Sequence, residues 1–280
     1  MVLRKPEWIR VKIQGGGKSN KVSSLLEDLS LNTVCNDADC PNMMECFERG
    51  TATFMILGRN CTRNCTFCNV TREKPDEVMA DEPVNVAKAV SELNLKHAVI
   101  TSVTRDDLED QGANQFASIV KEIRKTSPNV SIELLIPDMQ GNKDLIDIII
   151  DSEPNILNHN VETVPELYDT VRPMAEFERS IEVLEYVKKQ KPNMRTKSGV
   201  MLGLGETKEQ VIEVLKRLRE VDCDMLTLGQ YLQPSKAHID VAEYIRPEQF
   251  DEYKEIALEM GFKRVASAPL VRSSYYAEDL

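Results

Sequence analysis

Six of the seven cysteines in this 280-residue chain form two sets of three that follow each other closely in the sequence. The N-terminal cysteine set is Cys35, Cys40 and Cys46, and the loop cysteine set is Cys61, Cys65 and Cys68, in a C-x3-C-x2-C pattern. A [4Fe–4S] cluster that is held only by cysteine takes four thiolates. Three thiolates in one short loop leave one iron open to a substrate or cofactor. The spacing therefore predicts a metal centre at which chemistry takes place.

Other roles for these cysteines fit less well. A structural zinc ion takes four ligands, and the three histidines, His97, His159 and His238, are all distant from both sets in the sequence. Disulfides form in oxidising compartments, whereas the first residues lack the apolar segment of a secretion signal. We therefore expect a cytoplasmic, iron-binding protein, with zinc or inert core cysteines as the alternatives. The seventh cysteine, Cys223, stands alone and is expected in the core.

The charge of the chain limits its partners. Its 35 Lys and Arg residues against 46 Asp and Glu residues give a formal net charge of −11, which argues against general nucleic-acid binding. No apolar run is long enough to span a membrane, so we expect neither nucleic acid nor membrane as a partner. Residues 1–21 are basic although the chain as a whole is acidic, because they carry six Lys and Arg side chains. They form either a solvated arm or, with residues 15–17 as a glycine hinge, a strip that docks an acidic partner.

After residue 50, short apolar runs alternate with amphipathic segments. The expected strands are residues 53–57, 97–103, 131–136, 155–161, 195–202 and 225–231. The expected helices are residues 84–93, 113–125, 143–150, 177–190, 208–221 and 247–260, and one further short helix, residues 22–29, precedes them in the N-terminal extension. Thr207 and Gln210 form a capping-box pattern at the start of one helix. Six strand–helix repeats imply parallel strands with right-handed crossovers. We expect an α/β partial (β/α)6 TIM-like barrel with N- and C-terminal extensions, with an open doubly wound sheet as the alternative.

The loop cysteine set directly follows the first expected strand, and sites in such folds lie at the carboxyl ends of the strands. With Phe67 before its last cysteine, this loop resembles the signature of the radical S-adenosylmethionine (SAM) superfamily. The resemblance implies that the open iron binds SAM. It also implies that one electron from the cluster cleaves SAM to a 5′-deoxyadenosyl radical, which removes hydrogen from an unactivated carbon. The partial barrel is the usual fold of that superfamily.

The N-terminal cysteine set, with spacings of four and five residues, resembles the lipoyl synthase family, in which it holds an auxiliary [4Fe–4S] cluster. Arg272, Ser273, Ser274 and Tyr275 resemble the C-terminal motif of that family, and this implies Ser274 as the fourth ligand of the auxiliary cluster. Further matches are residues 5–8, 101–107, 158–163 and 196–206. One departure is that the chain ends five residues after Tyr275, where the family's tail often runs further.

By this resemblance the chain inserts two sulfur atoms, at C6 and C8 of an octanoyl group on a carrier lysine. The sulfur comes from the auxiliary cluster, which is consumed. The implied carrier is an octanoylated lipoyl domain or a glycine cleavage H protein. Further implied partners are an electron donor such as ferredoxin or flavodoxin and an iron–sulfur carrier that rebuilds the cluster. The implied regions are an N-terminal extension (1–50), the barrel (51–261) and a tail (262–280) that closes on the auxiliary cluster. We expect Ser274 and Cys40 at the same mouth of the barrel.

Strand alternation predicts that Asn158, Asn160 and Glu162 lie on one side of the fourth expected strand. We expect Glu162 to accept from the ribose hydroxyls of SAM, with a structural polar cluster as the alternative. His159 is expected to point away from the site. Arg172 or Lys197 is expected to pair with the carboxylate of SAM. Met201 and the rest of the glycine-rich segment 199–206 are expected to line its adenosine pocket. The remaining expected SAM contacts are Phe67, Thr101 and Ser102.

That glycine-rich segment lacks the third glycine of a dinucleotide loop, because Lys208 stands in its place. Two other functions stay open. One is a different SAM-dependent sulfur-inserting enzyme with an auxiliary cluster. The other is an electron carrier with two saturated clusters that does not bind SAM.

Overall fold

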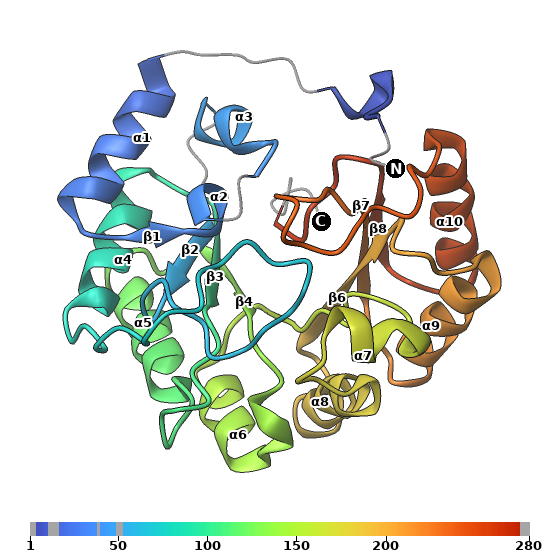
Figure 1. The fold of residues 1–280 in the computed structure, drawn as a ribbon. Helices are drawn as coiled ribbons and strands as arrows, with labels where there is room; N and C mark the ends of the chain where they lie inside the picture. Colours follow the sequence, from blue (N-terminus) through green and yellow to red (C-terminus); the bar gives the residue numbers. More distant parts are fainter. Residues whose placement is uncertain (1–3, 11–16, 38–39, 49–52, 275–280) are drawn as a thin grey trace. The chain divides into compact units, whose positions relative to one another are not determined.

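The structure is a computed structural model that describes residues 4–10, 17–37, 40–48 and 53–274 (Figure 1). Of the expected glycine hinge, Gly15 and Gly16 lie outside the described residues and Gly17 begins a helix. Tyr275 also lies outside them. The chain divides into two compact units. The N-half unit comprises Lys12–Arg63 and Asn69–Leu157, and the C-half unit comprises Met1–Val11, Asn64–Cys68 and Asn158–Leu280.

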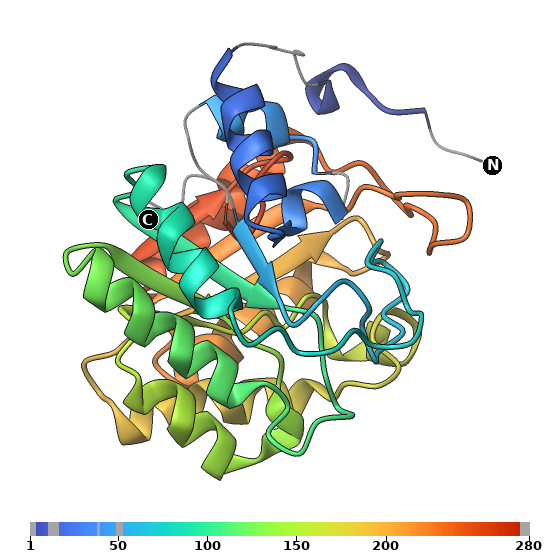
Figure 2. The same ribbon diagram turned by 90° about the vertical axis from the view of Figure 1, so that its left-hand side faces the viewer.

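The N-half unit contains the first strands in chain order. Its strands are β1 (Asn32–Thr33), β2 (Thr53–Ile56), β3 (His97–Ser102), β4 (Ser131–Leu135) and β5 (Ile156–Asn158), whose last residue begins the C-half unit. Its helices are α1 (Gly17–Asp28), α2 (Val34–Asp37), α3 (Met43–Glu48), α4 (Glu82–Glu92), α5 (Ala113–Thr126), η2 (Met139–Gly141) and α6 (Lys143–Asp151). Strands β2, β3 and β4 are parallel, and β1 is antiparallel to β2. Helices α4 and α5 lie side by side along these strands, and Figure 2 shows them in front of the sheet.

The C-half unit continues the same alternation. Its strands β6 (Arg195–Leu202), β7 (Met225–Gln230) and β8 (Arg264–Ser267) are parallel and follow chain order. Its helices are η1 (Glu7–Ile9), η3 (Pro165–Leu167), α7 (Tyr168–Val171), α8 (Phe177–Gln190), α9 (Lys208–Glu220) and α10 (Pro247–Glu259). The capping box of Thr207 and Gln210 begins α9 as predicted.

Strand β6 divides its side chains between two faces. Val200 and Leu202 belong to a buried core that also holds residues of β7, α8, α9 and α10. Successive strand residues point to opposite faces, so Lys197, Gly199 and Met201 lie on the face turned away from these helices. This second face carries the polar and small residues that the sequence assigns to the site.

The six expected strands and the expected helices are confirmed, with ends that differ by a few residues. The structure adds two strands that the sequence did not indicate. Strand β1 has only two residues, which is too short for a periodic signal. Strand β8 begins within the segment expected as a polar tail and pairs with β7. Its signal in the sequence is weak because the strand has only four residues and one of its two buried positions is the polar Ser267.

Candidate active site

The first part of the cysteine loop belongs to the N-half unit. The Cys61 N–H donates to the carbonyl of Thr71 at 2.8 Å, and Asn60 and Thr71 form a parallel β-bridge. The Cys61 Sγ accepts backbone N–H groups from Thr104 at 3.3 Å and from Arg63 at 3.5 Å. These two N–H groups orient the Cys61 sulfur within the loop.

The second part of the loop belongs to the C-half unit and is held by segments distant in sequence. The Thr66 N–H donates to the Val171 carbonyl at 3.0 Å, and the Ile239 N–H donates to the Thr66 carbonyl at 3.1 Å. His238 Nε2 lies 3.1 Å from the Cys68 carbonyl oxygen. Phe67 packs against a small buried cluster that Met201 also contacts. Two expected SAM contacts are thus brought together.

The N-terminal cysteine set lies in and between the short helices of the N-half unit. Cys35 is buried in α2, and its carbonyl accepts the N–H of Cys40 at 3.1 Å. Cys46 lies in α3, where its N–H donates to the Asn42 carbonyl at 2.9 Å. Burial raises the pKa of the Cys35 thiol to about 11, and the neighbouring Cys40 adds to this rise.

All seven cysteines are free thiols, which is the donor chemistry that iron–sulfur clusters require. Among the described residues, no group of three or more His, Cys, Asp or Glu side chains lies together as a metal site would need. The two ligand sets therefore rest on their spacing and their thiol chemistry.

The polar residues after β5 form a connected group in the C-half unit. The Asn160 Nδ2 donates to Glu162 Oε1 at 3.1 Å, which confirms that the two side chains share a face. The Glu162 N–H donates to the Gly199 carbonyl, and the Met201 N–H donates to the Glu162 carbonyl. Burial raises the pKa of the Glu162 carboxyl, while the charge of Arg172 and the bond from Asn160 act in the opposite direction.

Several buried side-chain oxygens in the described part of the chain have no hydrogen-bond partner there, and two of these oxygens belong to expected SAM contacts. These two are Asn160 Oδ1 in the C-half unit and Ser102 Oγ at the end of β3 in the N-half unit. Buried polar atoms in folded proteins almost always find a partner. These oxygens therefore fit a polar ligand that completes their hydrogen bonds. Thr101 differs, because its hydroxyl already donates to the Leu135 carbonyl at 2.9 Å.

The two cations expected for the SAM carboxylate have different surroundings. Arg172 Nη1 donates to the carbonyls of Asn160 at 3.0 Å and Val161 at 3.2 Å, and its guanidinium lies 5.3 Å from the centre of the Tyr168 ring. Arg172 is thus fixed beside the Asn160 and Glu162 group. Lys197 is fully buried on β6, on the same face as Gly199 and Met201. Asn158 and His159 are buried as well, at the end of β5.

The glycine-rich segment after β6 has two uses. A Cβ at Gly199 would lie 2.8 Å from both Asn160 Oδ1 and Thr227 Oγ1, so only glycine leaves room for the Asn160 side chain. Further on, the Glu206 carboxylate accepts the N–H groups of Gly203 at 2.6 Å and Leu204 at 2.9 Å. These N–H groups are therefore already used, which agrees with the absence of a dinucleotide loop. Sequence reasoning missed this role of Glu206.

The C-terminal segment crosses the end of β7. The Gln230 N–H donates to the Pro269 carbonyl at 3.2 Å, and Ser274 is half-buried in the turn that follows. Gly229, over which this segment passes, is aligned with Met201 of β6 in the sheet register. Ser274 is thus carried on a segment that passes the carboxyl end of β7.

Two further observations concern residues outside this group. Cys223 is fully buried, as predicted, in the core formed by β6, β7 and helices α8, α9 and α10, and burial raises the pKa of its thiol to about 12. None of the helices in the described part of the chain is both long and apolar enough to cross a membrane.

Comparisons with known proteins agree with this geometry. The Radical SAM superfamily model matches residues 55–218, more than half of the chain. The chain is 55% identical to a lipoyl synthase of Caldicellulosiruptor saccharolyticus, over 100% of this chain and 98% of that protein. It is 54% identical to a lipoyl synthase of Caldanaerobacter subterraneus subsp. tengcongensis, over 99% and 97% of the two chains.

Solved structures show the fold. Methylornithine synthase (PylB) superposes with a TM-score of 0.59 at 17% identity, covering 94% of this chain and 87% of that one. The FeFe-hydrogenase maturase HydG from Carboxydothermus hydrogenoformans superposes with a TM-score of 0.58 at 13% identity, covering 93% and 76%. These likenesses and the parallel strand–helix order confirm the expected α/β partial barrel.

Proposed function

Because this chain belongs to the lipoyl synthase family of the radical SAM superfamily, we propose how its own residues divide the work of sulfur insertion. The reaction installs two sulfur atoms, at C6 and C8 of a protein-bound octanoyl-lysine, and gives the lipoyl cofactor. The cofactors are two [4Fe–4S] clusters, and SAM is the cosubstrate.

The loop cysteine set holds the cluster that acts on SAM. When bound, this cluster supplies the electron that cleaves SAM, and the radical so formed removes hydrogen from the substrate carbon. The role of the chain is to leave one iron without a protein ligand, which three thiolates do. Two backbone N–H groups donate to Cys61 Sγ and hold that sulfur in place within the loop. Phe67 packs against the same small buried cluster as Met201 and so helps to hold the loop.

The C-half unit supplies a site for the nucleoside of SAM. Asn160 Oδ1 needs a donor, and the Glu162 carboxylate can accept from neighbouring hydroxyls, so together they suit a ribose. Arg172 lies beside them and is the better carboxylate ligand of the two candidate cations, because its planar fork binds both oxygens. Asn158 and Lys197 complete this face. Ser102 Oγ and Thr101 of β3 are assigned to the amino acid end of SAM.

The N-terminal cysteine set and Ser274 hold the auxiliary cluster, which is the sulfur donor and therefore a substrate. A serine oxygen binds iron more weakly than a thiolate, which suits a site that must release iron. The packing of the tail over Gly229 supports this assignment, because it fixes the segment that carries Ser274. The proposed regions remain an N-terminal extension (1–50), the barrel (51–261) and a closing tail (262–280).

The substrate is an octanoylated lipoyl carrier protein. Within that class we propose a lipoyl domain or a glycine cleavage H protein, with ferredoxin or flavodoxin as the electron donor. An iron–sulfur carrier would rebuild the auxiliary cluster after each turnover. The clustering of six cysteines in two ligand sets supports a cytoplasmic location, because that compartment keeps thiols reduced.

The observation that carries the assignment is the pair of cysteine sets in a chain that matches a lipoyl synthase over 98% of that protein. The test uses anaerobically reconstituted protein with dithionite, SAM and an octanoyl-lysine peptide, followed by mass spectrometry. We expect a peptide that gains two sulfurs, and that has lost two hydrogens once its two thiols are oxidised to the cyclic disulfide, together with 5′-deoxyadenosine. Formation of 5′-deoxyadenosine without sulfur on the peptide would indicate another SAM-dependent reaction, and its absence despite full iron content would favour an electron carrier.

A matched pair of variants separates the two clusters. Cys65→Ala should abolish 5′-deoxyadenosine, because it removes a ligand of the cluster that acts on SAM. Cys40→Ala should retain 5′-deoxyadenosine but add no sulfur to the peptide. The same loss in both variants would contradict the proposed division of roles.

A further inference from the structure

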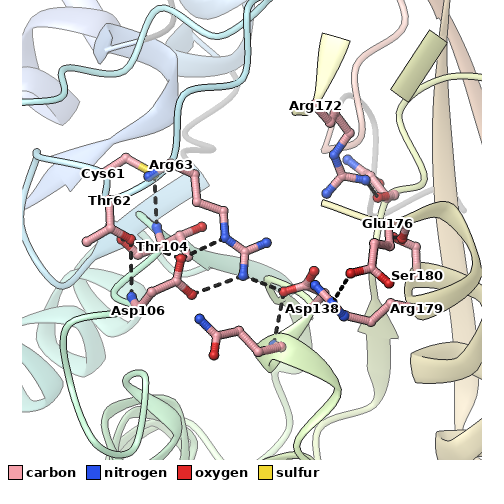
Figure 3. A network of polar contacts seen from close by, with 12 residues as sticks. Cys61, Thr62, Arg63, Thr104, Asp106, Asp138, Arg172, Glu176, Arg179 and Ser180 are labelled. Carbon is pink, nitrogen blue, oxygen red and sulfur yellow. Dashed lines mark hydrogen bonds and ion pairs between the residues drawn. The ribbon is translucent and has the colours of Figure 1, made fainter. Parts of the chain in front are cut away.

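Arg63 is a buried arginine inside the cysteine loop, at the middle of the three residues between Cys61 and Cys65. Only 5% of its side chain is exposed. Its Nε lies 2.8 Å from Asp106 Oδ2, and its Nη2 lies 3.0 Å from Asp106 Oδ1 and 2.6 Å from Asp138 Oδ1 (Figure 3). One guanidinium thus joins two carboxylates, which hold its pKa above its usual range although burial alone would lower it.

The two carboxylates stand at the ends of neighbouring parallel strands of the N-half unit. Asp106 follows β3, and Asp138 follows β4, where its Oδ1 also accepts the N–H of Gln140 at 3.1 Å. The Asp138 side chain is fully buried, and 15% of the Asp106 side chain is exposed. A buried carboxylate needs a cationic or hydrogen-bonding partner. Arg63 therefore fixes the beginning of the loop to two strand ends at once.

The same anchor reaches the sulfur of Cys61. The Thr62 N–H and hydroxyl both donate to the Thr104 carbonyl at 3.0 Å, and the Asp106 N–H donates to the Thr62 hydroxyl at 3.1 Å. These bonds hold the backbone of Thr104 beside Cys61. The N–H groups of Thr104 and Arg63 are the two that donate to Cys61 Sγ. Hydrogen bonds to cluster sulfurs help to set the reduction potential of a cluster.

We propose that Arg63 is a positioning residue that holds Cys61 against its two N–H donors and so raises the reduction potential of the cluster bound by the loop cysteine set. The inference rests on the proposed function, because it takes Cys61 as a cluster ligand. An N–H donor favours the more negative, reduced state, so loss of this alignment makes the cluster harder to reduce. Arginine is required because only its planar fork reaches both carboxylates.

The test compares Arg63→Lys with Arg217→Lys in the 280-residue chain after anaerobic reconstitution. Arg217 makes the same kind of two-pronged contact, with Glu178 at 2.9 and 2.6 Å, but lies on α9, outside the cysteine loop. The readouts are iron per chain, thermal unfolding, and a potentiometric titration of the electron paramagnetic resonance signal that changes when SAM is added. That response identifies the cluster of the loop cysteine set.

In Arg63→Lys we expect the ratio of reduced to oxidised SAM-responsive cluster to fall at least tenfold at a fixed potential, which corresponds to a shift of about 59 mV for one electron. The auxiliary-cluster signal and the Arg217→Lys variant should keep wild-type values. A lower unfolding temperature with unchanged iron content and potential would overturn the proposal, since Arg63 would then be only structural. If Arg63→Lys does not fold, Asp106→Asn is measured in its place, and we expect it to lower the reduction potential of the SAM-responsive cluster by a smaller amount. A wild-type protein without any SAM-responsive signal would instead refute the proposed function.

Discussion

A Cβ atom added to Gly229 would lie 2.1 Å from the carbonyl oxygen of Val271, so the C-terminal segment lies directly against the backbone of β7. Glycine is required here for space. This contact lies three residues before Ser274. The geometry of β7 therefore determines where the proposed serine ligand is placed.

Gly229→Ala should displace the segment that carries Ser274. We expect destabilisation of about 1–3 kcal/mol from overpacking, and a fall of at least tenfold in sulfur insertion if Ser274 is a ligand. Formation of 5′-deoxyadenosine should persist. Ser274→Ala, which leaves the backbone contact intact, should reproduce the loss of sulfur insertion without the destabilisation. Normal sulfur insertion in both variants would rule out this role of the tail.

Glu162→Gln should weaken SAM binding. The variant keeps the shape of the side chain but loses the charge that strengthens hydrogen bonds to ribose hydroxyls, an effect of about 1.5–3 kcal/mol. Anaerobic equilibrium dialysis should therefore show an affinity lower by about ten- to a hundredfold, with unchanged iron content. Glu178→Gln, an exposed change on α8, is the matched control. Equal affinity in the two variants would place the ribose elsewhere.

His238 should be needed to hold the second part of the cysteine loop. Its Nε2 lies 3.1 Å from the Cys68 carbonyl, and its Nδ1 lies 2.9 Å from Ser235 Oγ. His238→Ala should lower the iron bound by the loop cysteine set, whereas His238→Gln, which can still donate to that carbonyl, should restore part of it. Iron analysis, together with the electron paramagnetic resonance signal that responds to SAM, measures this difference between His238→Ala and His238→Gln. Full iron content in His238→Ala would contradict this expectation.

Asp224 should stabilise the C-half unit in a pH-dependent way. Burial alone would raise the pKa of Asp224, but hydrogen bonds from Lys188 and Lys263 outweigh burial and lower it. A carboxyl with a lowered pKa in the folded state contributes stability above its unfolded pKa of about 3.9, and this stability is lost as the pH falls through the folded value.

Asp224→Asn should therefore reduce the free energy of unfolding by roughly 3 kcal/mol at neutral pH. The difference from the wild type should stay constant between pH 8 and pH 5 and narrow only below about pH 4. Urea unfolding across this range measures it. If the difference in unfolding free energy between the wild type and Asp224→Asn instead grows as the pH falls, the pKa of Asp224 is not lowered in the folded state.

The sequence alone determined much of this protein. The spacing of the cysteines is local, so three thiols within eight residues indicate a cluster loop whatever the rest of the chain does. The order of strands and helices follows from hydrophobic period, and the cap of Thr207 follows from its neighbour Gln210. These features depend on residues a few positions apart, and one sequence therefore suffices to predict them.

Tertiary structure decided what distant residues do to each other. Arg63 reads as an ordinary basic residue until Asp106 and Asp138, 43 and 75 positions away, are brought to it by adjacent strands. Glu206 looks available for a ligand, but it binds the N–H groups of its own loop. Hydrogen bonds and close packing require atoms within a few ångströms, and only the folded chain sets such separations between residues that are far apart in sequence.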